Sequence, residues 1–204
     1  MSVTEVQTLP RDAEEGAAQL EVIVPRLGAL VAEVGPTELG LSTPCDGWAV
    51  RDLLNHVVGG AEMFAGALQG GPVHDISGRL PDALGDDPLG AFERAAEHFG
   101  AAAQSPGATE RVLDLPFGSM QGATFLRFVA FDLLVHSWDL ATTLGSELDV
   151  PDDVVVGAGR IAHRTLDGRE RDGRTFAEST VAPGGATPLE RLVAFTGRSV
   201  PGRP

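Results

Sequence analysis

Apolar residues recur at helical spacing along much of the chain. In residues 13–34, 50–68 and 122–144 they fall three and four positions apart, which is the pattern of a helix that buries one face. The positions expected on these faces are Leu20, Ile23, Leu27, Leu30 and Val34, then Leu53, Val57, Phe64 and Leu68, and then Phe125, Val129, Leu133 and Leu140. Three helices are therefore predicted, and Pro25 predicts a bend or a break in the first, because proline lacks an amide donor.

Helix-capping residues predict three more helices. Asp87 followed by proline opens one that carries Leu89, Phe92, Ala96 and Phe99 on its inner face. Acidic residues begin a shorter helix over residues 151–166, and a capping box at residues 187–190 begins a last one that ends at Gly197. Residues 35–46 are expected to form a loop, residues 112–120 are too short for a long element, and residues 168–185 form a loop or weak hairpin.

These elements predict an all-α fold: a four-helix bundle with additional short C-terminal helices. The length of 204 residues, with 43% hydrophobic and 22% charged positions, is enough for one core, so residues 1–204 are expected to form a single domain. Aromatic residues make up only 5%, and tyrosine is absent. This composition favours packing of small side chains between helices over a large sheet.

The charge and cysteine content narrow the range of partners and compartments. A formal net charge of -14 disfavours binding to phosphate backbones and anionic lipids, so no nucleic acid and no membrane is expected, and a small molecule is the favoured partner. Cys45 is the only cysteine, which excludes an intramolecular disulfide and a four-cysteine zinc site. The polar, acidic N-terminus resembles no export signal, so a cytoplasmic location is expected. A homodimer is compatible with the sequence, which does not decide the oligomeric state.

The predicted buried face of the helix over residues 122–144 carries two ionisable side chains, Asp132 and His136, on consecutive turns. Residues four apart on a helix lie about 6 Å apart, so the carboxylate and the imidazole can converge on one cation. Two alternatives stay open: a simple Asp–His hydrogen bond, and a helix rotated so that both residues meet solvent.

A third metal ligand is predicted at His56, in the middle of the helix over residues 50–68, which should pack against the helix that carries Asp132 and His136. Two imidazoles and one carboxylate leave coordination positions open, as catalytic divalent-metal sites do. Zinc suits this set best, and nickel, iron and manganese tolerate it. Asp139, one turn after His136, is a candidate to accept the second ring N–H of that histidine, the alternative being a solvent-facing carboxylate.

Two tryptophans and the cysteine lie close in sequence to the predicted metal ligands. Trp48 and Trp138 are large apolar side chains, for which packing is favoured over lining a pocket. Cys45 precedes the helix that carries His56, where a nearby cation would make it reactive, but a small buried hydrophobic role is favoured.

Three stretches of the chain resemble a known family. They are residues 43–56 (TPCDGWAVRDLLNH), residues 136–141 (HSWDLA), and residues 172–176 (DGRTF) with the later Gly197 and Arg198. Their order and content resemble the DinB/YfiT-like metalloenzyme superfamily, in particular actinobacterial metal-binding proteins grouped with the metal-binding domain of mycothiol-dependent maleylpyruvate isomerase.

The resemblance implies a metal site and a thiol cofactor. In that family a histidine of the second helix and an acid or histidine one turn before a histidine of a later helix hold the metal, which corresponds here to His56, Asp132 and His136. The resemblance also implies mycothiol as a cofactor. The isomerase has glutamate where this chain has Asp132, a shorter side chain expected to move the metal or to contact it through water. The isomerase also has a further C-terminal domain at its active site, so isomerisation of maleylpyruvate itself is not expected here.

Three functions of different classes follow from these observations. The first is a metal-dependent S-transferase that uses a low-molecular-weight thiol, of mycothiol type, against small electrophiles. The second is a non-catalytic metal-binding or stress-response protein. The third is a metal-dependent hydrolase in which Asp139 or another carboxylate assists a water molecule. We rank them in this order.

Overall fold

The computed structural model describes residues 3–73, 80–115, 118–168, 171, 173 and 176–201, with side chains from residue 11 onward. Asp172, Arg174 and Thr175 of the DGRTF stretch lie outside the described residues. The elements in chain order are α1 (Val3–Ala32), the short 3-10 helix η1 (Glu38–Gly40), α2 (Val50–Leu68), α3 (Pro88–Ala103), β1 (Val112–Leu115), β2 (Gly118–Gln121), α4 (Gly122–Leu144), α5 (Asp152–Leu166) and α6 (Pro188–Phe195).

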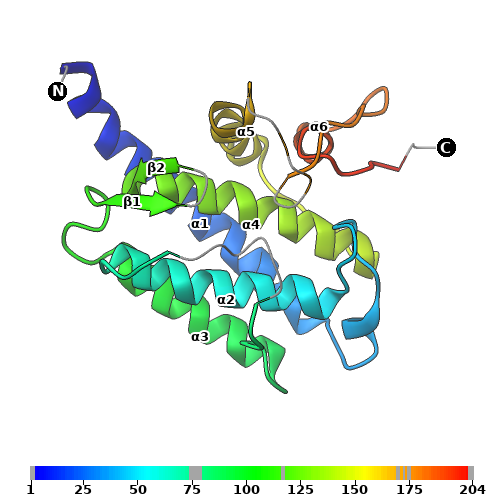
Figure 1. Ribbon diagram of the computed structural model, residues 1–204. Coiled ribbons are helices and arrows are strands. Elements are labelled where there is room, and N and C mark those ends of the chain that lie inside the picture. The colour runs from blue at the N-terminus through cyan, green and yellow to red at the C-terminus, as the bar shows by residue number, and fades with distance from the viewer. Residues whose placement is uncertain are drawn as a thin grey trace.

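The four long helices form the predicted bundle, and its helices are packed as two close pairs. Helix α1 lies along α4 and α2 lies along α3, whereas α2 and α4 contact each other more sparsely (Figure 1). Helices α5 and α6 cover the side of α4 that faces away from α2 and α3 (Figure 1). The all-α class and the short C-terminal helices predicted from the sequence are confirmed.

Helix α1 differs from the prediction in two respects. It begins near Val3, about three turns earlier than expected, and it runs to Ala32 without a break at Pro25. Proline removes the amide donor that would bond the carbonyl of Glu21, yet the helix continues on both sides of Pro25. A break at Pro25 is therefore wrong, and a bend there stays a prediction.

The segment before α4 forms a short antiparallel hairpin. Strand β1 pairs with β2 so that Val112 lies opposite Gln121 and Leu115 lies opposite Gly118. Leu113 and Leu115 are buried and their neighbours are exposed, as the alternation of side chains along a strand requires. The hairpin closes one end of the bundle and leads directly into α4 (Figure 1).

Helix α4 is the centre of the molecule and is buried on almost every side. Phe125 and Phe131 are fully buried in one part of the core, which packs α4 against α1, the hairpin, α5 and α6. Leu27 and Leu53 belong to a second part, which packs α1, α2 and α3 against the C-terminal end of α4. Among the described residues, no helix is both long and apolar enough to cross a membrane.

A buried ion-pair network joins α1 to α4. Arg127 of α4 is 2% exposed and donates to Asp12 at 2.6 Å and to Glu15 at 3.2 Å. Asp12, 5% exposed, is also 3.4 Å from Arg164 of α5. A buried charge is tolerated when partners of opposite charge surround it, so this network determines how the three helices meet.

We predict that Arg127→Met lowers the free energy of unfolding by about 3 kcal/mol, because it leaves the buried Asp12 carboxylate with only a half-exposed partner. Urea unfolding followed by circular dichroism measures this change. Arg94→Met is the matched control, since Arg94 is 69% exposed and its contact with Asp87 is 3.9 Å long; it should change stability by less than about 0.5 kcal/mol. Equal effects of the two substitutions would contradict the assigned role of the network.

Candidate metal centre

A tight loop before α2 determines how this helix enters the bundle. Thr43 donates its backbone N–H to the carbonyl of Trp48 at 2.9 Å, and Trp48 donates to the carbonyl of Cys45 at 3.1 Å. Gly47 has a φ of 74°, in the left-handed region that favours glycine. The Asp52 carboxylate accepts the backbone N–H of Ala49 at 3.1 Å and so caps the start of α2.

His56 lies on the face of α2 that is turned toward α4. There its Nε2 atom is 4.0 Å from Oδ2 of Asp132, and Nε2 of His136 is 3.7 Å from Oδ1 of the same carboxylate. The two imidazole rings meet edge to face, with centroids 5.1 Å apart. The structure thus brings together the three side chains singled out in the sequence, and neither the rotated helix nor a lone Asp–His pair describes the arrangement.

These three side chains fit a divalent metal ion. One ligand atom from each lies within 4.8 Å of the other two. Nitrogen and oxygen ligands about 2.0–2.2 Å from a zinc ion are separated by roughly 3.3–3.6 Å, so the most widely spaced donors would have to approach one another by up to about 1.5 Å. Aspartate has a shorter side chain than glutamate, but Asp132 stays a candidate metal ligand because its carboxylate lies between the two imidazoles. The side chains of His56, Asp132 and His136 are 12%, 18% and 7% exposed, so the site is shielded yet open to small molecules.

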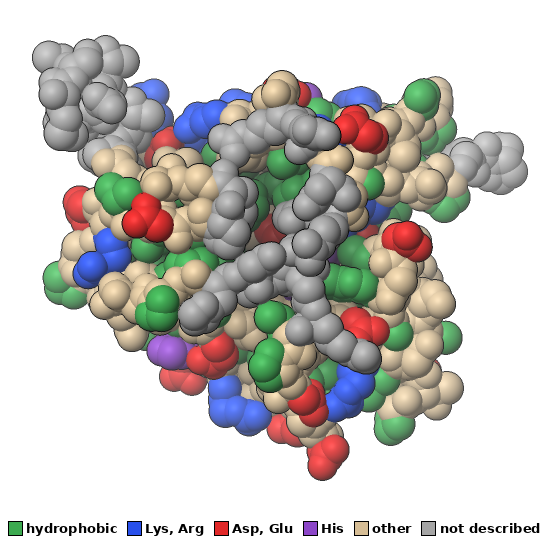
Figure 2. Space-filling model, in the orientation of Figure 1, with side chains coloured by type: hydrophobic (Ala, Val, Ile, Leu, Met, Phe, Trp, Pro, Cys, Tyr) green, Lys and Arg blue, Asp and Glu red, His purple; other side chains and the backbone are tan. Residues whose placement is uncertain are grey.

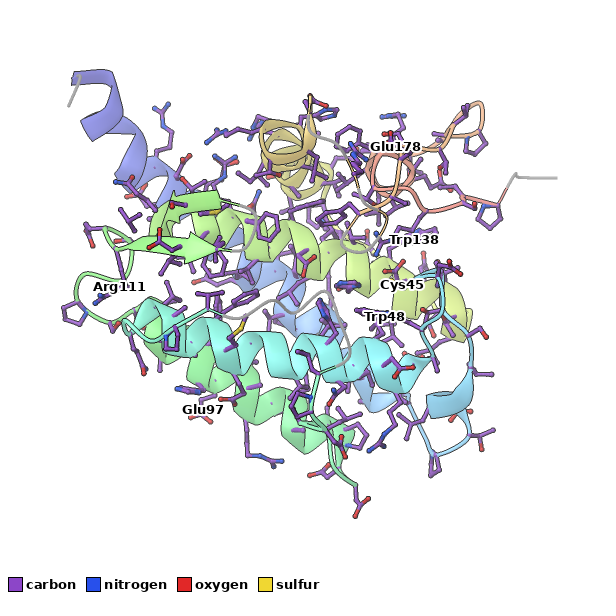
Figure 3. The ribbon with its side chains drawn as sticks, viewed as in Figure 1. Cys45, Trp48, Glu97, Arg111, Trp138 and Glu178 are labelled. Carbon is purple, nitrogen blue, oxygen red and sulfur yellow. The ribbon has the colours of Figure 1, made fainter. Side chains whose placement is uncertain are left out.

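Trp48 forms a wall of the candidate site. Its ring centroid is 4.9 Å from that of His56 and 6.2 Å from that of His136, which it faces nearly in parallel. Figure 3 shows Trp48 and Cys45 together between α2 and α4, and Trp138 on the side of α4 toward α6. Trp138 is 9% exposed and packs into the core. Trp48 therefore combines the packing role favoured from the sequence with contact to two candidate ligands.

Asp139 binds the second ring nitrogen of His136. Its Oδ2 atom is 3.1 Å from Nδ1 of His136, and the Asp139 side chain is fully buried. Burial alone raises the pKa of Asp139, but the hydrogen bond from His136 and the charge of Arg198 outweigh it and lower that pKa to about 2. An ionised carboxylate at this position directs Nε2 of His136 toward Asp132 and His56.

Arg198, in the segment after α6, neutralises Asp139. Its guanidinium donates to both carboxylate oxygens, at 3.2 Å and 2.9 Å, a bidentate geometry that makes strong ion pairs. Burial by itself lowers the pKa of Arg198, but the adjacent Asp139 carboxylate raises it above its ordinary value. The preceding Gly197 has a φ of 94°, and a Cβ atom there would lie 2.6 Å from the Cβ of Ala177. Glycine is therefore required for the turn that brings Arg198 inward.

Cys45 contacts the ion pair of Asp139 and Arg198, and the charge of Arg198 disfavours a metal ion at this position. The Cys45 thiol donates to Asp139 at 3.1 Å, accepts from Arg198 at 3.1 Å, and lies 3.9 Å from Nδ1 of His136. Cys45, His136 and Asp139 form a second group with ligand-like spacing. The guanidinium of Arg198 already occupies this side of Asp139, and its positive charge would repel a cation bound there.

Sequence reasoning assigned no role to Arg198 and favoured a simple packing role for Cys45. Both residues fall within the stretches that resemble the metal-binding family, which was the one available signal. Asp139 and Arg198 are 59 positions apart and share no helix, so no periodicity links them.

A mostly apolar cavity adjoins the candidate metal site. It has a volume of about 40 Å³ and lies between α1, α2, α3 and α4. His56 and Asp132 form part of its wall, and the aromatic rings of Phe64, Phe92 and Phe99 form another part. Figure 2 shows hydrophobic side chains at the surface among acidic and basic ones on the face in view. Two of the three candidate ligands thus border an apolar space between the helices.

Comparison with known proteins identifies relatives over most of the chain. Residues 20–141 match the family model described as the mycothiol maleylpyruvate isomerase N-terminal domain. Two uncharacterized proteins of Mycobacterium tuberculosis, from strains CDC 1551 and H37Rv, are each 32% identical over 173 residues, which cover 84% of this chain and 91% of the relative.

Two solved structures share the fold. The crystal structure of a mycothiol-dependent maleylpyruvate isomerase has a TM-score of 0.55 at 15% identity, and that of a variant with one histidine replaced by alanine has a TM-score of 0.57 at 14% identity. Each match covers 79% of this chain and 72% of the other chain. The DinB-like fold predicted from the sequence is confirmed.

We predict that His136 in the metal-free protein titrates near pH 10. Burial lowers the pKa of His136, but Asp132, and then the hydrogen bond to Asp139, outweigh burial and raise it from 6.5 to about 10. A raised folded-state pKa stabilises the fold fully below about pH 6.5, and this contribution is lost as the pH rises toward 10. Imidazole chemical shifts in NMR, with urea unfolding at each pH, measure both effects.

The matched variants for this titration are His136→Gln and His163→Gln. His136→Gln should remove the NMR titration assigned to His136 and weaken the decline in stability between pH 6.5 and 10. His163→Gln changes an exposed histidine, so the titration of His136 and the decline in stability should both remain. Titration of His136 at or below pH 6.5 in metal-free protein would contradict the electrostatic role of Asp132 and Asp139.

Proposed function

The chain belongs to the mycothiol maleylpyruvate isomerase N-terminal domain family, and we propose that it is a metal-dependent S-transferase. In this proposal His56, Asp132 and His136 hold one divalent metal ion. The thiol is of low molecular weight and of mycothiol type, and the acceptors are small electrophiles. A cytoplasmic location is part of the proposal, because such a thiol and the free Cys45 persist in a reducing compartment.

The observation that carries the proposal is the meeting of three ligand-type side chains from two helices at a shielded position. Donors from α2 and α4 converge within 4.8 Å, and the most buried of the three, His136, already has an ionised carboxylate on its other ring nitrogen. A buried carboxylate–imidazole cluster without a cation is costly, since each charged group loses hydration. A divalent ion bound here would supply positive charge beside the Asp132 carboxylate.

Each side chain has a role that follows from its contacts. A divalent ion bound here would lower the pKa of a thiol that reached its open coordination position and so favour the nucleophilic thiolate. Asp132 and the two histidines act as ligands, not as acid–base groups. Asp139 and Arg198 orient the His136 ring, and Trp48 limits the space beside both imidazoles. Zinc is the metal we propose, with nickel second, because two imidazoles and one carboxylate suit both ions.

The hydrolase alternative has less support from the geometry. A general base must be free to take a proton from water, but Asp139 is held by both Arg198 and His136 and has its pKa lowered to about 2. A purely structural metal is also less favoured, because structural sites are closed, whereas these side chains border a cavity.

We predict that protein purified without added metal carries close to one divalent ion per chain and that His56→Ala loses most of it, since removal of one of three ligands leaves an incomplete site. Elemental analysis by mass spectrometry measures the stoichiometry. His98→Ala is the control: His98 is an exposed histidine of α3 paired with Glu62 at 2.7 Å, and its loss should leave the bound metal unchanged. Unaltered metal content in His56→Ala would remove this histidine from the ligand set.

A second prediction concerns the dependence of turnover on thiol. The zinc- or nickel-loaded protein should convert the electrophile chlorodinitrobenzene only when mycothiol is added, and the rate should fall to that of the uncatalysed reaction in His56→Ala but not in His98→Ala. Absorbance of the thioether product measures the rate. Turnover that is equal with and without thiol would eliminate the transferase proposal.

A further inference from the structure

We propose that the cavity beside His56 and Asp132 is the electrophile-binding subsite, and that it selects uncharged electrophiles with a slender apolar body, such as α,β-unsaturated aldehydes and ketones of medium chain length. The inference rests on the proposed S-transferase function and adds the class of acceptor. Four observations carry it: the lining of the cavity, its charge, its length and its position.

The lining is almost entirely apolar. Apart from His56 and Asp132, the residues around the cavity are glycine, alanine, valine, leucine and phenylalanine. Phe64, Phe92 and Phe99 contribute aromatic rings from α2 and α3. Such walls bind an apolar ligand by removing its surface from water, at about 25 cal/mol per Å² of buried apolar area.

The charge of the cavity disfavours anionic acceptors. No arginine is among the described residues that line it, and its ionisable residues are Asp132 and His56. The buried Arg198 is already paired with both oxygens of Asp139. In the metal-free protein, a carboxylate-bearing ligand would bury its charge near the Asp132 carboxylate and without an arginine among the lining residues.

The cavity is long and follows the axis of α2. Its lining on α2 runs from His56 to Phe64, nine residues whose eight intervals span about 12 Å at 1.5 Å per residue. Its lining on α3 runs in the same way from Phe92 to Phe99. The two candidate metal ligands lie at one end of the α2 lining and the aromatic rings extend beyond them. An acceptor with its reactive carbon near His56 would therefore place an alkyl chain along the helices.

The transfer step in this subsite is a conjugate addition. The thiolate sulfur supplies an electron pair that forms a C–S bond to the β-carbon, while the π pair of the C=C bond moves toward the carbonyl oxygen. The α-carbon then takes up one proton, equal to the proton released when the thiol ionised. The product is a thioether, no group leaves, and nothing is oxidised or reduced.

The test uses two alanines of the same helix. Ala96 of α3 lines the cavity, so Ala96→Leu fills it, whereas Ala101 of the same helix is exposed and absent from the lining, so Ala101→Leu adds the same side chain outside. Ala61→Leu fills the cavity from α2 and serves if Ala96→Leu does not fold, as judged by circular dichroism.

Binding is measured first, on metal-free protein, with the uncharged fluorophore N-phenylnaphthylamine. We expect the wild type and Ala101→Leu to bind it, nonanol to displace it, and the anion nonanoate to displace it at least about tenfold more weakly, given the cost of burying a lone carboxylate. We expect Ala96→Leu and Ala61→Leu to lose the binding. Unchanged binding in both filling variants, or equal displacement by nonanol and nonanoate, would overturn the inference.

Turnover with mycothiol is measured second, comparing nonenal with crotonaldehyde, which carries the same reactive group on a shorter chain. Each buried methylene is worth about fourfold, so nonenal should have a kcat/KM at least about tenfold higher in wild type and Ala101→Leu, and the preference should vanish in Ala96→Leu. Turnover without chain-length preference would overturn the subsite and leave the transferase proposal standing. Absence of any thiol-dependent turnover would overturn the transferase proposal, while the binding measurement still decides which ligands enter the cavity.

Discussion

The burial of Arg127, His136 and Asp139 on the central helix α4, with Asp132 partly buried beside them, is the constraint from which the rest of the structure follows. Arg127, Asp132, His136 and Asp139 all lie on a helix that other elements cover on almost every side. A buried charge is stable only beside a partner, and each partner here comes from a different part of the chain. Asp12 and Glu15 of α1 meet Arg127, Arg198 after α6 meets Asp139, and His56 of α2 meets Asp132. The pairing of charges therefore specifies how the surrounding helices are placed.

The four side chains differ in the length of their ion-pair contacts, and the longest contacts lie at the proposed metal site. Arg127 and Asp139 have short ion pairs at 2.6 Å and 2.9 Å. The contacts among His56, Asp132 and His136 are 3.7–4.0 Å long, and they lie where α2 and α4 pack most sparsely. Long contacts around a carboxylate leave room for a small cation, whereas the closely paired groups provide rigid support. The ion-pair contacts at the proposed metal centre are thus longer than the shortest contacts of Arg127 and Asp139.

The sequence predicted helices α2 and α4 with their observed bounds, because local signals mark both ends: a loop rich in glycine and proline before α2, and Gly145 after α4. Helical spacing also sufficed to bring Asp132 and His136 together, since residues four apart share a face. Their binding of metal remains a prediction. The role of Arg198 was not predicted, because its contact with Asp139 depends on the packing of α6 and on the turn at Gly197. No local sequence pattern encodes either of these. The continuity of α1 through Pro25 likewise depends on tertiary packing that overrides local propensity.

The apolar cavity beside the candidate ligands is the feature that packing alone does not explain. Walls without contacting atoms lose dispersion energy, so an apolar void in a bundle core is destabilising. Ala61 and Ala96 line this void, and larger side chains at either position would fill part of it. A bundle selected only for stability would gain from such replacements, whereas a binding protein must keep the space that its ligand occupies. The cavity lies against two proposed metal ligands and not in a remote part of the core. Its place in the fold therefore favours a role in binding over a simple packing defect.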